Sequence, residues 1–184
     1  MKSSYKVRAE HFINTIFPYL KGNFYNLYLV KRAVRDYNAR YHRNVIVCNG
    51  SSRCVLVTSD YVVKWVYNET MAEAIGGNEE ELATYKLACE EGYDYLLAEC
   101  SSVIKNGIQF NIMPRLNMYI HNKPDIFSLL SGDEMCWIAD HIEDIHDENY
   151  TIVDGAPIIV DYACPPRSNY FFDTDEYNSF SGSM

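Results

Sequence analysis

The stretch that decides the fold is NVIVCNGSSRCVLVTSDYVVKWVY, residues 44–67. It contains three short runs rich in valine, which are separated by the polar connections NGSS and SD. Short runs of β-branched residues favour strands, and brief polar connections between them favour hairpins. The stretch therefore predicts a three-stranded antiparallel meander.

Helical patterns flank this meander on both sides. Residues 4–42 carry apolar side chains at spacings of three and four, interrupted by Pro18 and the polar KGN that follows, which predicts two amphipathic helices. After the meander, NEEELATYKLACEEG predicts a helix with Asn78 as its N-cap, glutamates in its first turn and Gly92 just past its end. We therefore expect two helices, the meander and a third helix, in that order.

The second half of the chain alternates strands and helices. YLLAECSSVIKNGIQFNIMPRL, residues 95–116, predicts two strands around a KNG turn, ended by Pro114. DIFSLLSG and GDEMCWIADHIEDI predict helical segments, and the apolar run at 156–160 predicts a strand that ends on Asp161. The final residues, 165–184, lack helical periodicity and carry turn and disorder signals.

Composition restricts the class of protein. A chain of 184 residues with 48% hydrophobic residues is long enough to bury a core, as one globular domain or as one domain with an appended segment. Its net charge of -9 argues against binding to nucleic acid or to an anionic membrane surface, and no apolar run reaches about 18 residues. The six cysteines form no CxxC pair, so we expect mostly buried free thiols in a reducing compartment. We therefore predict a cytoplasmic protein without nucleic-acid or membrane partners.

Asp161 raises a question of chemistry, because a carboxylate at the end of a buried strand is costly unless it is paired. A metal ion is one such partner. Phosphoryl transfer from ATP needs a loop over the phosphates, a cation on their oxygens, an acid that holds this cation, magnesium ligands and a base for the accepting hydroxyl. The chain carries a candidate for each part.

In the order of these candidates, the chain resembles the protein kinase and aminoglycoside phosphotransferase superfamily, above all its very small bacterial and bacteriophage-encoded members. The motifs that carry the resemblance are NGSSRCV, VVKWV, EELATY, IMPRL, DIHDEN and IIVDYA. The resemblance implies an α+β, protein-kinase-like fold: an antiparallel N-lobe sheet with an αC-type helix and a truncated, minimal helical C-lobe, preceded by two N-terminal helices. It also implies the cofactors ATP and Mg²⁺.

The resemblance implies a role for each motif residue. Lys64 would bind the α and β phosphates of ATP and pair with a glutamate of the next helix. Glu81 is the first candidate for that glutamate, and Glu79 and Glu80 remain alternatives. Asp144, in DIHDEN, would be the catalytic base. The residues implied to contact the nucleotide are Gly50, Ser51, Ser52, Val55, Lys64, Met113 and Arg115, and those implied to bind magnesium are Asn149 and Asp161.

The resemblance also divides the chain into four segments. These are an N-terminal helical segment (1–43), an N-lobe with the nucleotide-binding sheet and helix (44–116), a truncated C-lobe with the catalytic-type loop (117–164) and a flexible tail (165–184). Too few residues follow Asp161 for the activation segment and substrate-docking helices of the family. We expect the two N-terminal helices to pack on the shortened lobe and to supply the missing mass.

Three departures from the family pattern leave the function open. The phosphate loop has one glycine and ends on Arg53, Ile142-Glu143 precedes Asp144 in place of His-Arg or His-Gly, and DYA replaces Asp-Phe-Gly. One interpretation is an ATP- and Mg²⁺-dependent phosphotransferase that acts on hydroxyls of a protein substrate. The other is a catalytically weak or inactive kinase-like binding protein, a pseudokinase such as a phage factor that engages a host or defence protein in the host cytoplasm.

Two further interpretations have less support. Phosphorylation of an aminoglycoside or other small molecule fits the DIH motif, but little chain remains to build a substrate pocket. A metal hydrolase built on His141 and His146 is disfavoured because their spacing of five does not place both side chains on one helical face.

Overall fold

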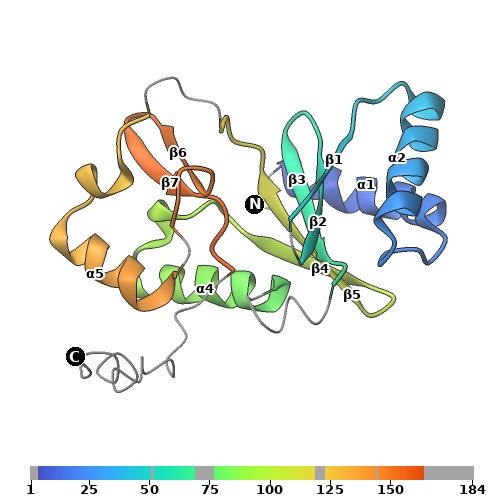
Figure 1. Ribbon diagram of the computed structural model, residues 1–184. Helices are drawn as coiled ribbons and strands as arrows, with labels where there is room; N and C mark the ends of the chain where they lie inside the picture. Colours follow the sequence, from blue (N-terminus) through green and yellow to red (C-terminus); the bar gives the residue numbers. More distant parts are fainter. Residues whose placement is uncertain (1–3, 51, 69–76, 119–122, 144, 164–184) are drawn as a thin grey trace, which may run out of the picture.

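The computed structural model describes residues 4–50, 52–68, 77–118, 123–143 and 145–163 of the chain. Within these ranges the protein is an α+β structure with four α-helices and a five-stranded antiparallel sheet (Figure 1). The predictions made for Ser51, Asp144 and the 165–184 tail lie outside the described residues.

The sheet has the order β1-β2-β3-β5-β4, and every neighbouring pair is antiparallel. Its strands are β1 (Ile46–Asn49), β2 (Arg53–Val57), β3 (Tyr61–Val66), β4 (Ser101–Lys105) and β5 (Ile108–Pro114). The first three strands are the predicted meander, and β4 and β5 form the predicted hairpin. Asn106 and Gly107 at its turn have φ angles of 50° and 79°, as a two-residue turn between twisted strands requires.

The two faces of this sheet differ in chemistry, because residues opposite each other in an antiparallel pair project to the same side. Cys54 lies opposite Trp65, whereas Val55 lies opposite Lys64, and Lys64 in turn lies opposite Asn111. One face is therefore apolar, with Cys54, Leu56, Val63, Trp65, Phe110 and Ile112 all buried. The other carries Lys64 and Asn111 at its centre.

Helices α1 (Ser4–Leu20) and α2 (Leu27–Tyr41) cover the apolar face. Their apolar stripes join one hydrophobic core with β2, β3 and β5, and the indole nitrogen of Trp65 donates a hydrogen bond of 3.0 Å to the Phe24 carbonyl. The two predicted helices are thus confirmed, but the expectation that they pack on the shortened lobe is wrong. The apolar face of the sheet must be buried against another layer of secondary structure, and α1 and α2 form that layer.

Helix α4 (Asn78–Glu91) lies against the other side of the sheet. It ends as predicted, with Gly92 in the left-handed region at φ 82°. Its N-cap is Gly77, not Asn78 as predicted, and the Gly77 amide donates to Glu80 Oε2 at 2.8 Å. Asn78 is the first helical residue, and its buried side chain turns toward the sheet instead.

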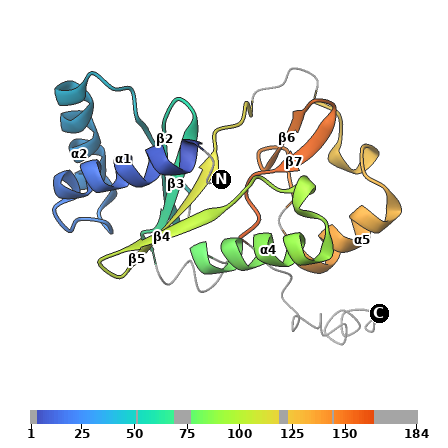
Figure 2. The ribbon, with the colours of Figure 1, turned by 180° about the vertical axis from the view of Figure 1, so that it is seen from behind.

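A second hydrophobic core joins α4 to the C-terminal half. This half contains the short 3₁₀ turns η1 (Asp94–Leu96) and η2 (Ile126–Ser128), helix α5 (Gly132–His141) and a hairpin of β6 (Tyr150–Val153) and β7 (Ala156–Ile159). Helix α5 is shorter than predicted, since the next residue, Ile142, is already extended. Figures 1 and 2 show α5 and this hairpin at the end of the molecule away from α2.

The five described cysteines are free, as predicted, but only Cys54 and Cys100 are buried. Burial raises the pKa of both thiols to about 12, so neither is a thiolate near neutral pH. Within the described residues, no helix has the length and apolar character needed to cross a membrane.

Candidate functional site

The centre of the candidate site is an ion pair between β3 and α4. The Lys64 ammonium group donates to Glu81 Oε1 at 2.7 Å and to the Val160 carbonyl at 2.9 Å. Both side chains are buried, and Glu81 has no exposed surface. Of the three candidate glutamates it is therefore Glu81 that pairs with Lys64, since Glu80 accepts from the start of the helix and Glu79 is exposed.

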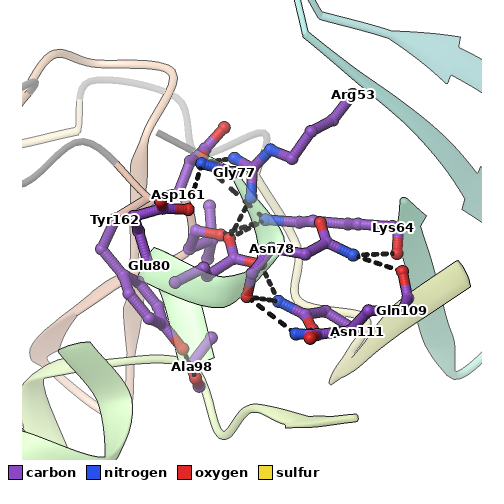
Figure 3. A network of polar contacts seen from close by, with 12 residues as sticks. Arg53, Lys64, Gly77, Asn78, Glu80, Ala98, Gln109, Asn111, Asp161 and Tyr162 are labelled. Carbon is purple, nitrogen blue, oxygen red and sulfur yellow. Dashed lines mark hydrogen bonds and ion pairs between the residues drawn. The ribbon is translucent and has the colours of Figure 1, made fainter. Parts of the chain in front are cut away.

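The second oxygen of Glu81 is also satisfied. Asn111, on β5, donates to Glu81 Oε2 at 3.0 Å and to the Asn78 carbonyl at 2.8 Å. The amide of Asn78 returns two hydrogen bonds to the sheet, to the carbonyl of Lys64 at 2.9 Å and to that of Gln109 at 2.8 Å. A buried carboxylate is stable only when its lone pairs are used, and here Lys64 of β3 and Asn111 of β5 supply the partners, while Asn78 of α4 holds Asn111 in place (Figure 3).

Arg53 brings a second positive charge into the same site. Its guanidinium lies 2.8 Å from Glu81 Oε1 and donates a hydrogen bond to Asp161 Oδ1 (Figure 3). Lys64 Nζ lies 3.9 Å from that same Asp161 oxygen. Two cations and two carboxylates thus form one compact network, in which two positive and two negative formal charges cancel.

The network changes the protonation of its members. Burial alone would raise the pKa of the Asp161 carboxyl, but the charges of Lys64 and Arg53 outweigh it and hold this pKa below its usual range. Burial lowers the pKa of Arg53, whereas Glu81 and Asp161 raise it by more, so the guanidinium stays charged. The Asp161 side chain is nevertheless 44% exposed, so it is accessible to a ligand.

The β6-β7 hairpin brings the backbones of the predicted magnesium ligands Asn149 and Asp161 near each other. The Val160 amide donates to the Asn149 carbonyl at 2.8 Å, which places Asn149 across from the residue before Asp161. The turn that closes the hairpin uses Asp154 and Gly155, at φ 53° and 85°. Predicted base Asp144 lies outside the described residues.

The donor set suits magnesium only in part. A carboxylate and an amide oxygen are ligands that Mg²⁺ accepts. One oxygen of Asp161, however, is already engaged by Arg53, so a metal would have to use the other oxygen or displace the guanidinium. Among the described residues, no group of three or more His, Cys, Asp and Glu side chains could hold a metal by itself.

The two described residues of the predicted phosphate loop differ in their exposure. Gly50 is exposed at the β1-β2 connection, where its amide donates to the Arg53 carbonyl at 3.0 Å. Ser52, also predicted to contact the nucleotide, is buried, and its carbonyl accepts from the amides of Tyr67 and Asn68. These two hydrogen bonds extend the pairing of β2 with β3 and draw Ser52 inward.

Two further residues predicted to contact the nucleotide, Met113 and Arg115, are firmly anchored to their neighbours. Met113 is buried in the second hydrophobic core. Arg115 donates from its side chain to the Thr58 carbonyl at 2.8 Å and from its amide to the Asp60 carbonyl at 3.0 Å. That amide is therefore already engaged within the protein. Val55, opposite Lys64, is half-buried on the face that carries the ion pair.

Sequence reasoning missed three members of the site: Arg53 as a site residue, Asn78 beyond a capping role, and Asn111. A signal for Arg53 existed, because in the strand RCVLV the alternation places Arg53 and Val55 on one face. For Asn111 no local signal existed, since its role depends on the pairing of β3 with β5.

Comparison with known proteins returns nothing: no protein-family model, curated protein or solved structure matches this chain. Any inference about function therefore rests on the geometry of the site and on the motifs of the sequence.

Proposed function

We propose that the protein is a kinase-like phosphotransferase that binds ATP and Mg²⁺ in the cytoplasm and transfers phosphate to hydroxyls of a protein substrate. The observation that carries the proposal is the buried ion pair of Lys64 and Glu81, with Asp161 3.9 Å from the same ammonium group. Kinase catalysis requires a lysine on a strand paired with a glutamate on the following helix, and a metal-binding aspartate in place beside them. The strand, helix and aspartate of this chain support that use.

Each residue has a task in this proposal. Lys64 binds phosphate oxygens of the nucleotide, and Glu81 holds its ammonium group in position. Asn149 and Asp161 would hold Mg²⁺, which when bound would neutralise charge on the phosphates. Asp144 is proposed as the base on its motif alone.

Arg53 favours a second candidate, a kinase-like binding protein with weak or no catalysis. Its guanidinium already neutralises Asp161, the residue that would otherwise bind metal. Together with Lys64 it could hold a nucleotide's phosphates without a metal, since arginine binds phosphate oxygens in a bidentate manner. The two candidates therefore differ in whether nucleotide binding depends on Mg²⁺.

Thermal unfolding separates the candidates. The protein is heated alone, with ATP and EDTA, and with ATP and Mg²⁺, as wild type and as Asp161→Asn. A matched control is Asp154→Asn, the same change in the hairpin turn, where asparagine tolerates the positive φ. Ligand at about 100 times its Kd stabilises by about 2.7 kcal/mol, which raises Tm by about 5–11 °C at this size.

The outcomes point in different directions. A rise in Tm that needs Mg²⁺ and disappears only in Asp161→Asn supports the phosphotransferase, and the next step is an assay of γ-phosphate transfer to protein. An equal rise with EDTA supports the binding protein. If neither condition raises Tm in a protein that unfolds cooperatively, the nucleotide site itself is rejected.

A further inference from the structure

Charge is distributed very unevenly along this acidic chain. Residues 1–43 contain nine Lys and Arg against two Asp and Glu, a formal charge of +7. Residues 44–184 contain seven against twenty-three, a formal charge of -16. The net charge of -9 thus conceals a strongly basic N-terminal segment. Because surface charges act over about 8 Å at physiological salt, a partner feels the local charge of this segment rather than the net charge.

The structure gathers most of these cations on and around α2. Lys21, Lys31, Arg32, Arg35, Arg40 and Arg43 are all exposed, and we call them the basic surface. Within the described residues, none of the six forms an ion pair with a carboxylate, whereas Lys6 pairs with Glu99 and Arg8 with Asp60. Asp36 is the single acidic residue of α2.

The fold keeps these cations turned outward. Helix α2 buries Val30, Ala33, Val34 and Tyr37 in the core beneath it. At 100° per residue, Lys31, Arg32 and Arg35 then lie on the opposite side of the helix. Their exposure is therefore a consequence of the same packing that covers the sheet, and it does not depend on the nucleotide site.

Aromatic residues lie among the cations. Tyr28 is 74% exposed, one turn from Lys31 and Arg32, and Tyr25 and Tyr41 are 54% and 42% exposed. Between α1 and α2 is a hollow of about 760 Å³, with Tyr19, Lys21, Arg32, Asp36, Arg40 and Tyr41 in its wall. Tyrosine and arginine are, with tryptophan, the residues enriched at the energetic centres of protein interfaces.

We propose that the basic surface is a docking site for an acidic segment of a partner protein. Helix α2, with 15 residues, is only about 22 Å long, so the positive charge ends after a short distance. A nucleic acid carries a charge every ~1.7 Å along its whole length, so most of the charge of a longer strand would lie beyond the basic surface. An acidic protein segment can match the length of the basic surface, and its side chains can enter the hollow.

The test measures binding of a defined probe by fluorescence anisotropy, without nucleotide. The probe is a fluorescein-labelled peptide as long as α2, with glutamates along one helical face; a glutamine version is its control. The patch variant is Lys31→Gln with Arg35→Gln, and the matched variant is Arg8→Gln with Lys86→Gln. Both pairs remove one exposed lysine and one exposed arginine, so the net charge changes equally.

The proposal expects the glutamate peptide to bind wild type at about 0.05 M salt and more weakly at about 0.15 M, as screening requires. The patch variant should bind roughly 2- to 30-fold more weakly, the effect of two exposed ion pairs, and the matched variant should bind as wild type does. Equal losses in both variants, or no binding to wild type at the lower salt, would overturn the proposal. Oligothymidylate of the same charge is the competing probe. If it binds wild type more tightly than the glutamate peptide does, and loses as much affinity in the patch variant, the proposal is overturned in favour of nucleic acid.

Discussion

Replacing Glu81 by glutamine tests the central interaction of the site most directly. The carboxylate has no exposed surface and lies 2.7 Å from Lys64 Nζ and 2.8 Å from the Arg53 guanidinium. The neutral amide leaves two buried cations with Asp161 as their remaining carboxylate. Breaking a buried pair in this way costs about 3–5 kcal/mol.

Hydrogen-bond geometry adds to this cost. If the new amide turns its oxygen toward Lys64 and Arg53, its NH₂ group faces the NH₂ group of Asn111, which is already held by the Asn78 carbonyl. The opposite orientation sets NH₂ against the two cations. We therefore expect Glu81→Gln to lose about 4 kcal/mol of an unfolding free energy that is typically about 5–15 kcal/mol.

Urea unfolding measures the loss, with Glu79→Gln as the matched control. Glu79 lies in the same first turn but is exposed, so its change should cost only about 0.3–1 kcal/mol through the helix dipole. A loss below about 1 kcal/mol for Glu81→Gln, or equal losses for the two variants, would refute the conclusion that Glu81 is the buried partner of both cations.

Three further predictions follow from the fold and the charges. Because the pKa of Asp161 is held low, its carboxylate stabilises the fold fully above about pH 5 and progressively less as the pH falls through about 4. Wild type should therefore lose more stability than Asp161→Asn between about pH 6 and pH 3, as measured by urea unfolding. Leu56 is buried under the N-terminal helices, so Leu56→Ala should lower the free energy of unfolding by about 2–5 kcal/mol, whereas Ile104→Ala, at a side chain 69% exposed, should lower it by under about 1 kcal/mol. Equal losses would contradict the placement of α1 and α2. Gly155→Ala, at φ 85°, should cost about 1–2 kcal/mol in thermal or urea unfolding, and no cost would mean that the hairpin turn has another conformation.

The parts of the fold that sequence predicted are those with local signals. The valine-rich runs with NGSS and SD between them are sufficient for β1, β2 and β3, and Gly92 marks the end of α4. The spacing of motifs led to Lys64 and Glu81, and the structure resolves the choice among three adjacent glutamates because the helix turns each to a different side.

The parts that sequence did not predict depend on distant contacts. Arg53 meets Asp161 across 108 residues of chain, and no window of sequence contains both. The packing of α1 and α2 on the sheet, rather than on the C-terminal half, depends on which apolar surface lacks cover once all strands have paired. The basic surface was concealed by averaging, since a net charge of -9 combines two segments of opposite sign.

Asn78 has a consequence for how the proposed enzyme is controlled. Its side-chain NH₂ group donates two hydrogen bonds, to the carbonyls of Lys64 and Gln109, and its backbone carbonyl accepts two, from the side chains of Gln109 and Asn111. These four bonds attach the first turn of α4 to two strands. Swinging this helix outward, a motion that would separate Glu81 from Lys64, would break all four at once in a buried setting. We therefore expect the ion pair to stay assembled whether or not ligand is present, so that an on-off signal would have to act through access to the site rather than through displacement of the helix.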